Sequence, residues 1–219
     1  MPTTEAPPER ALKTPRAAAV AGVLCALILA TVIILVRQLP ADVVTDTGWL
    51  ANPSHRDTLN VALELVPFAG IFFLWFMGAI RDRVGAAEDK FFAMLFLGSG
   101  LLFVAMLFVL AEAASGLVAA ADSAPPTTEP QFWRFGQHLV LTVLASYVTR
   151  MAAVFTLSTT TIAQRLGILP RWLCRLGFLC AIFLMFVARS VPWSELLFPA
   201  WILAVSGHIL LRQLRPRAA

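Results

Sequence analysis

The stretch QHLVLTVLASYVTRMAAVFTLSTTTIAQR, residues 137–165, decides the class of fold that this chain adopts. It is apolar enough to enter a lipid bilayer, yet it carries Arg150 near its centre, the chain's single tyrosine, Tyr147, and hydroxyl side chains at residues 158–161. A charged side chain within hydrocarbon is costly and needs a partner. We therefore expect a helical membrane protein in which other helices surround this one.

The composition of the whole chain agrees with this expectation. Of its 219 residues, 59% are hydrophobic and 14% are charged, whereas soluble domains have about 25% charged residues. The apolar residues fall into blocks of about 20, which is the length that spans a bilayer. We predict an all-α bundle of six transmembrane helices, at about residues 17–36, 58–80, 91–113, 137–163, 172–188 and 193–211.

The two ends of the chain are predicted to lie outside this bundle. Residues 1–16 are polar and proline-bearing and are expected to form a disordered tail, and residues 213–219 form a short basic tail. The apolar block at residues 17–36 is longer than the roughly 7–15 apolar residues of a signal peptide. We therefore expect an uncleaved first span, with cleavage as the alternative.

Basic residues indicate how the bundle is oriented. Lys and Arg are concentrated on the side of the predicted bundle that holds both termini, and the positive-inside rule assigns that side to the cytoplasm. The protein is therefore predicted to lie in the plasma membrane with both termini inside. Twelve of the 17 basic residues fall on this side: Arg10, Lys13, Arg16, Arg81, Arg83, Lys90, Arg165, Arg171, Arg175, Arg212, Arg215 and Arg217.

Prolines mark the expected irregularities. Pro67 lies within the second span and Pro199 within the sixth, and proline lacks the N–H that continues a helical ladder. We expect a kink at each position. The prolines between residues 122 and 135 are expected to keep that segment in a loop.

The candidate functional site is a buried polar cluster around Glu64 and Arg150. Asn60 and Glu64 share a helix face at spacing four, and Tyr147 and Thr149 flank the arginine. A helix over residues 137–165 would be about 43 Å long, so that it could project beyond the membrane and bring Arg150 to Glu64. Such a cluster would either bind an anion or move a proton, or serve as a structural ion pair between two helices.

The same helix carries a stripe of small and hydroxyl side chains at spacings of three or four. The stripe could line a water-filled path, or it could permit close helix packing with each hydroxyl bonded to a carbonyl one turn earlier. Its members are Thr142, Ser146, Thr149, Ala153, Thr156 and Thr160.

Sequence patterns of other functional classes are absent. The net charge of +4 comes without a basic face interleaved with aromatic residues, which argues against nucleic-acid binding. Cys25, Cys174 and Cys180 form neither a disulfide framework nor a metal-binding motif. No zinc-protease, phosphate-loop or dinucleotide motif occurs. We therefore predict a protein that is not an enzyme and that has no cofactor or metal.

Three neighbouring segments carry a resemblance to other proteins. Residues 81–85 (RDRVG), 88–93 (EDKFFA) and 97–103 (LGSGLLF) resemble a stretch in multi-pass membrane proteins of GC-rich, actinobacterial-type genomes. No activity is assigned to that family, so the resemblance implies an integral membrane protein and nothing more specific.

The functional expectation follows from these observations. We expect a small transport-like or accessory membrane subunit with a polar site at Glu64 and Arg150. The alternative is a structural or assembly partner whose buried ion pair only holds helices together. The expected partners are the lipid bilayer and either another membrane protein or further copies of this chain.

Overall fold

The structure, a computed structural model, describes residues 15–37, 53–84, 90–123 and 130–214. Within these ranges every regular element is a helix, which confirms the predicted all-α class. Most of the two predicted tails, residues 1–16 and 213–219, lies outside the described residues.

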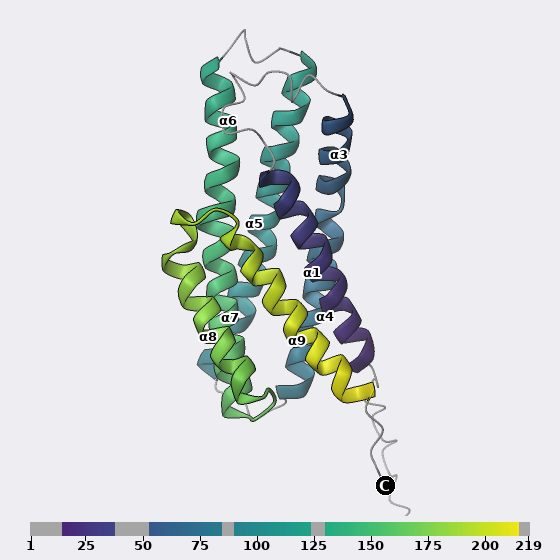
Figure 1. Ribbon diagram of the computed structural model, residues 1–219, viewed down its shortest axis with the longest axis vertical. Coiled ribbons are helices and arrows are strands. Elements are labelled where there is room, and N and C mark those ends of the chain that lie inside the picture. Colours follow the sequence, from purple (N-terminus) through teal and green to yellow (C-terminus); the bar gives the residue numbers. More distant parts are fainter. Residues whose placement is uncertain (1–14, 38–52, 85–89, 124–129, 215–219) are drawn as a thin grey trace, which may run out of the picture.

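The long helices run alternately up and down the bundle (Figure 1). The chain enters through α1 and returns to the same end through α9, so we call the opposite end, where α1 finishes at Arg37, the distal end. Two short 3-10 helices, η3 (Ala188–Ser190) and η4 (Ser194–Leu196), connect α8 to α9 at the distal end. The longer elements are α1 (Pro15–Arg37), α3 (Pro53–Glu64), α4 (Val66–Val84), α5 (Lys90–Ser123), α6 (Pro130–Thr142), the π-helix η2 (Val143–Val148), α7 (Thr149–Arg165), α8 (Arg171–Phe186) and α9 (Leu197–Leu214).

Five helical segments of the described chain are long and apolar enough to cross a membrane. The remaining long helix, α8, has 16 residues and is shorter than any of them. Its role as a sixth span stays a prediction. The five segments are Ala19–Arg37, Ser54–Asp82, Lys90–Ala120, Gln131–Arg165 and Ser194–Arg212.

The helices differ greatly in length, so the bundle consists of a main part and an extension at the distal end. The apolar part of α1 has 19 residues and measures about 28 Å, close to the roughly 30 Å thickness of a hydrocarbon core. By contrast, α5 has 34 residues, or about 51 Å. As a result, α3, the last turns of α5 and α6 extend past the distal ends of α1 and α9 (Figure 1).

Pro67, Pro130 and Pro199 affect the helices in different ways. In the second predicted span the helix is interrupted at Leu65, because Pro67 has no N–H to donate to the carbonyl of Leu63. The kink predicted at Pro199 is wrong, since α9 begins at Leu197 and a first turn needs no N–H from proline. The loop predicted up to residue 135 is also wrong, because Pro130 starts α6, again a favourable position for proline.

The centre of the bundle is filled by phenylalanine rings from four helices. The ring centroids of Phe73 (α4) and Phe103 (α5) are 4.9 Å apart, as are those of Phe73 and Phe155 (α7), and those of Phe103 and Phe198 (α9). All four side chains are at most 3% exposed. Tilted and edge-on contacts at these distances are the favourable geometry for aromatic rings, so this cluster closes the interior.

Candidate functional site

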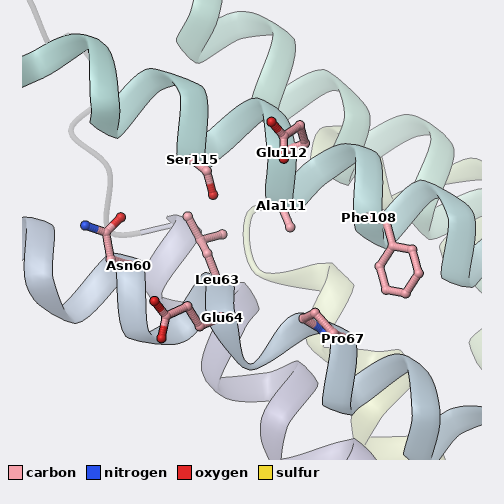
Figure 2. A pocket seen from close by; sticks show the side chains of 8 residues that line it. All are labelled: Asn60, Leu63, Glu64, Pro67, Phe108, Ala111, Glu112 and Ser115. Carbon is pink, nitrogen blue, oxygen red and sulfur yellow. The ribbon is translucent and has the colours of Figure 1, made fainter.

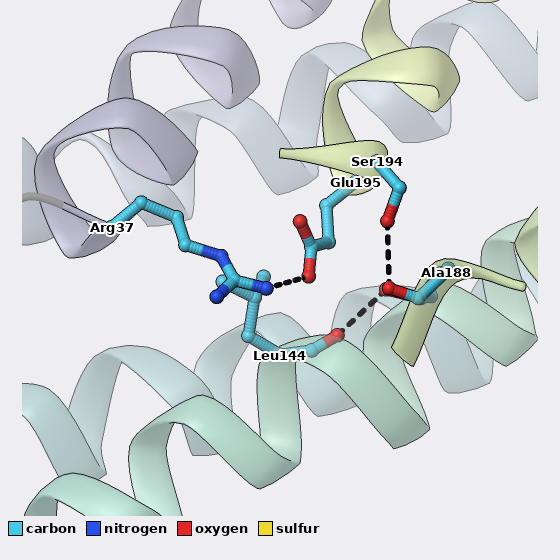
Figure 3. A network of polar contacts seen from close by, with 6 residues as sticks. Arg37, Leu144, Ala188, Ser194 and Glu195 are labelled. Carbon is cyan, nitrogen blue, oxygen red and sulfur yellow. Dashed lines mark hydrogen bonds and ion pairs between the residues drawn. The ribbon is translucent and has the colours of Figure 1, made fainter. Parts of the chain in front are cut away.

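A buried ion pair links the first helix to the start of the last one. Arg37 Nη2 at the end of α1 donates to Glu195 Oε1 in η4 (Figure 3). The Glu195 side chain is 2% exposed and the Arg37 side chain is 19% exposed. The pair therefore places a carboxylate inside the bundle and its cation near the distal surface.

A sharp turn of the chain directs Glu195 inward. Trp193 adopts a left-handed conformation, with φ of 68°, which is strained for a bulky side chain. Ser194 Oγ donates to the Ala188 carbonyl at 2.8 Å and so closes the turn that contains Trp193. Residues held in such conformations often lie at functional sites, so the turn is itself part of the candidate site.

The π-helix η2 lies across from this ion pair (Figure 3). The N–H of Thr149 donates to the Leu144 carbonyl five residues earlier, and the Thr149 hydroxyl donates to the same oxygen at 2.7 Å. A π-helical turn is wider than an α-helical one and occurs frequently at functional sites. In this chain the π-helix directly follows α6 and leads into α7.

A cavity of about 10 Å³ separates the π-helix from Glu195, with Leu144, Thr149 and Phe198 in its lining. That volume is at the lower limit for one water molecule. Glu195 Oε2 and Arg37 Nε are buried and have no hydrogen-bond partner within the described chain. A single water at this position could therefore complete the hydrogen bonding of the carboxylate.

A much larger pocket of about 390 Å³ opens between α3–α4 and α5. Figure 2 shows Glu64 on one helix and Glu112 on the other, on opposite rims of this groove. The described residues contain no group of three or more His, Cys, Asp or Glu side chains that could hold a metal ion. The groove is lined by Asn60, Leu63, Glu64, Pro67, Phe108, Ala111, Glu112 and Ser115.

The predicted pair of Glu64 and Arg150 is not formed in this structure. Both side chains are exposed, and Tyr147, with 55% of its surface accessible, is exposed beside Arg150. The prediction that Arg150 faces the interior is wrong, since its side chain is exposed. Arg150 lies near the middle of the continuous helical segment Gln131–Arg165, whose 35 residues are more than one membrane span requires.

The other predicted site residues are divided between two places. Asn60 is exposed and lines the groove together with Glu64, so the predicted spacing of four does bring these two together. Thr149 is 3% exposed and lines the small cavity beside Glu195. The structure thus separates the predicted cluster into a groove, a buried cavity and an exposed pair at the junction of η2 and α7.

Two members of the hydroxyl stripe, Thr149 and Thr156, show the hydrogen bonds that the packing interpretation predicts. Thr149 and Thr156 donate to backbone carbonyls of their own helix, at 2.7 and 2.8 Å. Thr160 Oγ1 differs, because it is buried without a partner in the described chain. Two of the five hydroxyl groups in the stripe are therefore satisfied within their own helix.

Sequence reasoning missed both members of the buried ion pair. It placed Arg37 in a loop and gave Glu195 no role. A signal was present, because Glu195 is the acidic residue of the last apolar block and the topology places it at the same end of the bundle as Arg37. No local signal marks the π-helix at residues 143–148, since its sequence VLASYV is compatible with an ordinary helix.

Comparisons with known proteins yield no match. No protein-family model matches the chain, and neither a curated protein nor a solved structure does so. The resemblance of residues 81–103 to actinobacterial-type membrane proteins stays a prediction.

Proposed function

We propose that this protein is a non-enzymatic accessory subunit of the plasma membrane that acts through contacts at its distal end. In this proposal α8 is a sixth span, both termini are cytoplasmic and the distal end faces outward. The distribution of basic residues supports this orientation. The extension formed by α3, the end of α5 and α6 then stands outside the hydrocarbon core.

The observation that carries the proposal is the aromatic cluster at the centre of the bundle. Phe73, Phe103, Phe155 and Phe198 come from four different helices and touch one another. A solute that crossed the bundle would have to displace several of these closely packed rings. A subunit that works by binding another protein needs no such path, and the closed interior therefore favours the accessory role.

The groove supports the location of that contact. Glu64 and Glu112 are exposed and make no ion pair with the described chain, and Asn60 and Ser115 add hydrogen-bonding groups to the lining. A basic side chain of a partner subunit would complement these rims. The buried pair of Arg37 and Glu195 has a structural role here, since it fixes α1 against η4.

A transport-like role centred on Glu195 is the second candidate. It is favoured by the Glu195 Oε2 atom, which has no partner among the described residues, and by the cavity that could hold one water next to it. Carboxylates within membrane bundles often belong to proton relays. In this alternative Glu195 would accept a proton, and its bond to Arg37 would weaken.

One pair of experiments separates the two roles. A photo-cross-linking amino acid replaces Ser115 in native membranes, and proton flux is measured with the purified protein in liposomes. The accessory role predicts a discrete adduct that is lost in the double variant Glu64→Gln/Glu112→Gln and retained in Asp57→Asn, an exposed acidic residue of α3 outside the groove. It also predicts no flux above protein-free liposomes.

The opposite results would contradict the proposal. An adduct that survives the double variant would exclude the groove as the contact. Proton flux that disappears in Glu195→Gln, together with no adduct at all, would instead support the transport-like role.

A further inference from the structure

Arg150 and Tyr147 are the only exposed residues of their helix between Leu139 and Leu157. They lie one helical turn apart where η2 passes into α7, and both side chains are exposed. Towards the distal end the next exposed apolar residue of the same helix is Leu139, at 42%, and in the opposite direction it is Leu157, at 41%. A guanidinium and a phenol thus interrupt a surface that suits lipid.

The depth of this pair corresponds to a membrane boundary. Arg150 precedes Arg165, at the other end of α7, by fifteen residues, or about 22 Å. Glu195 precedes Arg212 in the last span by seventeen residues, or about 25 Å. With a hydrocarbon core of roughly 30 Å aligned to α1 and α9, Arg150 lies just inside the distal boundary. Its long side chain can reach the headgroups from there.

Both side chains lack a partner in the part of the chain that the structure describes. Within the described residues, Arg150 and Tyr147 make no hydrogen bond and no ion pair. A guanidinium near hydrocarbon requires an acceptor, and at this depth the available acceptors are the phosphates of lipid headgroups. Its planar set of donors can bind two phosphate oxygens at once. The Tyr147 hydroxyl can donate to the same group, and tyrosine favours this depth.

We propose that Arg150 and Tyr147 bind the phosphate of an anionic phospholipid headgroup at the distal membrane boundary. An anionic lipid is favoured over a zwitterionic one, because a zwitterionic headgroup carries its own cation, which competes with the guanidinium. The site depends on the chain spanning a membrane and is independent of the accessory role, which rests on other residues.

The test measures lipid binding to the purified full-length protein by native mass spectrometry. The probes are dioleoylphosphatidylglycerol, dioleoylphosphatidylcholine and inorganic phosphate. We expect phosphatidylglycerol to bind more tightly than phosphatidylcholine. Loss of a charge-assisted hydrogen-bonded contact weakens binding about tenfold or more, so Arg150→Gln should lower the affinity for the first phosphatidylglycerol by about that factor. Tyr147→Phe should have a smaller effect in the same direction.

Two further variants provide the controls. Arg171→Gln removes an exposed arginine at the other end of the bundle and should leave the affinity for the first phosphatidylglycerol within about twofold. Arg150→Lys keeps the charge without the planar donors and should fall between Arg150→Gln and the unaltered protein. It also shows the effect of the side chain if Arg150→Gln fails to fold.

Three results would overturn the proposal. The first is equal affinity for the two lipids. The second is an equal loss of phosphatidylglycerol binding in Arg150→Gln and Arg171→Gln, which would indicate general attraction to basic residues. The third is displacement of the lipid by millimolar inorganic phosphate, which would assign the site to the free anion.

Discussion

Substituting the two members of the buried ion pair separately should destabilise the protein by unequal amounts. The Glu195 side chain is 2% exposed, so Arg37→Met leaves a carboxylate enclosed without its cation. Breaking a buried pair in this way costs about 3–5 kcal/mol of stability. We expect Arg37→Met to fall in this range, because the surroundings of Glu195 Oε2 provide no other donor in the described chain.

The reverse substitution should cost less. Glu195→Gln leaves Arg37, whose side chain is 19% exposed at the end of α1 and can turn toward the headgroup region. The glutamine oxygen can still accept a hydrogen bond, so we expect a loss of about 1–2 kcal/mol. The double variant Arg37→Met/Glu195→Leu removes both charges. It should lie within about 1 kcal/mol of the unaltered protein, because an apolar replacement of a buried pair is often neutral.

The assay is reversible unfolding of the purified protein in mild detergent, followed by tryptophan fluorescence across a titration with sodium dodecyl sulfate. Arg81→Met and Glu112→Gln change exposed residues of the same types and should leave the transition in place. The reasoning is refuted if Glu195→Gln costs as much as Arg37→Met. It is equally refuted if the double variant loses the sum of the two single losses.

Two further predictions concern buried contacts and use the same unfolding assay. Gly177→Ala should cost about 1–3 kcal/mol of stability, because a Cβ there would overlap Thr160 Oγ1 and lie 2.9 Å from Trp201 Nε1. The control Gly98→Ala, where a Cβ meets nothing within 4 Å, should be neutral or stabilising. Equal losses of stability in the two variants would contradict this prediction. Thr160→Val should stabilise the protein by about 1 kcal/mol, since it removes a buried hydroxyl that has no partner in the described chain. Thr156→Val removes a 2.8 Å hydrogen bond and should not stabilise the protein. A larger loss for Thr160→Val than for Thr156→Val would exclude this reasoning.

The sequence predicts the helices well where long-range packing is not needed to define them. Blocks of about 20 apolar residues indicate α1, α4 and α9 directly, because length and hydropathy are local properties. The errors lie where one residue has different effects in different positions. A proline stops a helix from within but favours its first turn, so the sequence alone does not distinguish Pro130 as a helix start from Pro130 as part of a loop.

The candidate site was harder to predict because it depends on where each helix lies along the membrane normal. Asn60 and Glu64 were correctly expected on one face, since their spacing of four is a property of a single helix. The partner of Glu64 was not predictable in the same way. A pair between two helices requires both the relative shift and the rotation of those helices, and the π-helix at residues 143–148 changes the rotation without a sequence signal.

The position of Arg150 shows how strongly the meaning of a charged residue depends on helix length. In a helix of 20 residues an arginine in the middle of the sequence is in the middle of the membrane, and it must face a polar partner inside the bundle. The segment Gln131–Arg165 has 35 residues, so in the proposed membrane alignment its midpoint is close to a boundary. There the same arginine is more stable facing outward, where lipid phosphates are within its reach, than inside a bundle filled by aromatic rings. The cation that pairs with a buried carboxylate is instead Arg37, which is half-buried at the end of α1 and whose partner Glu195 is held in the turn before α9.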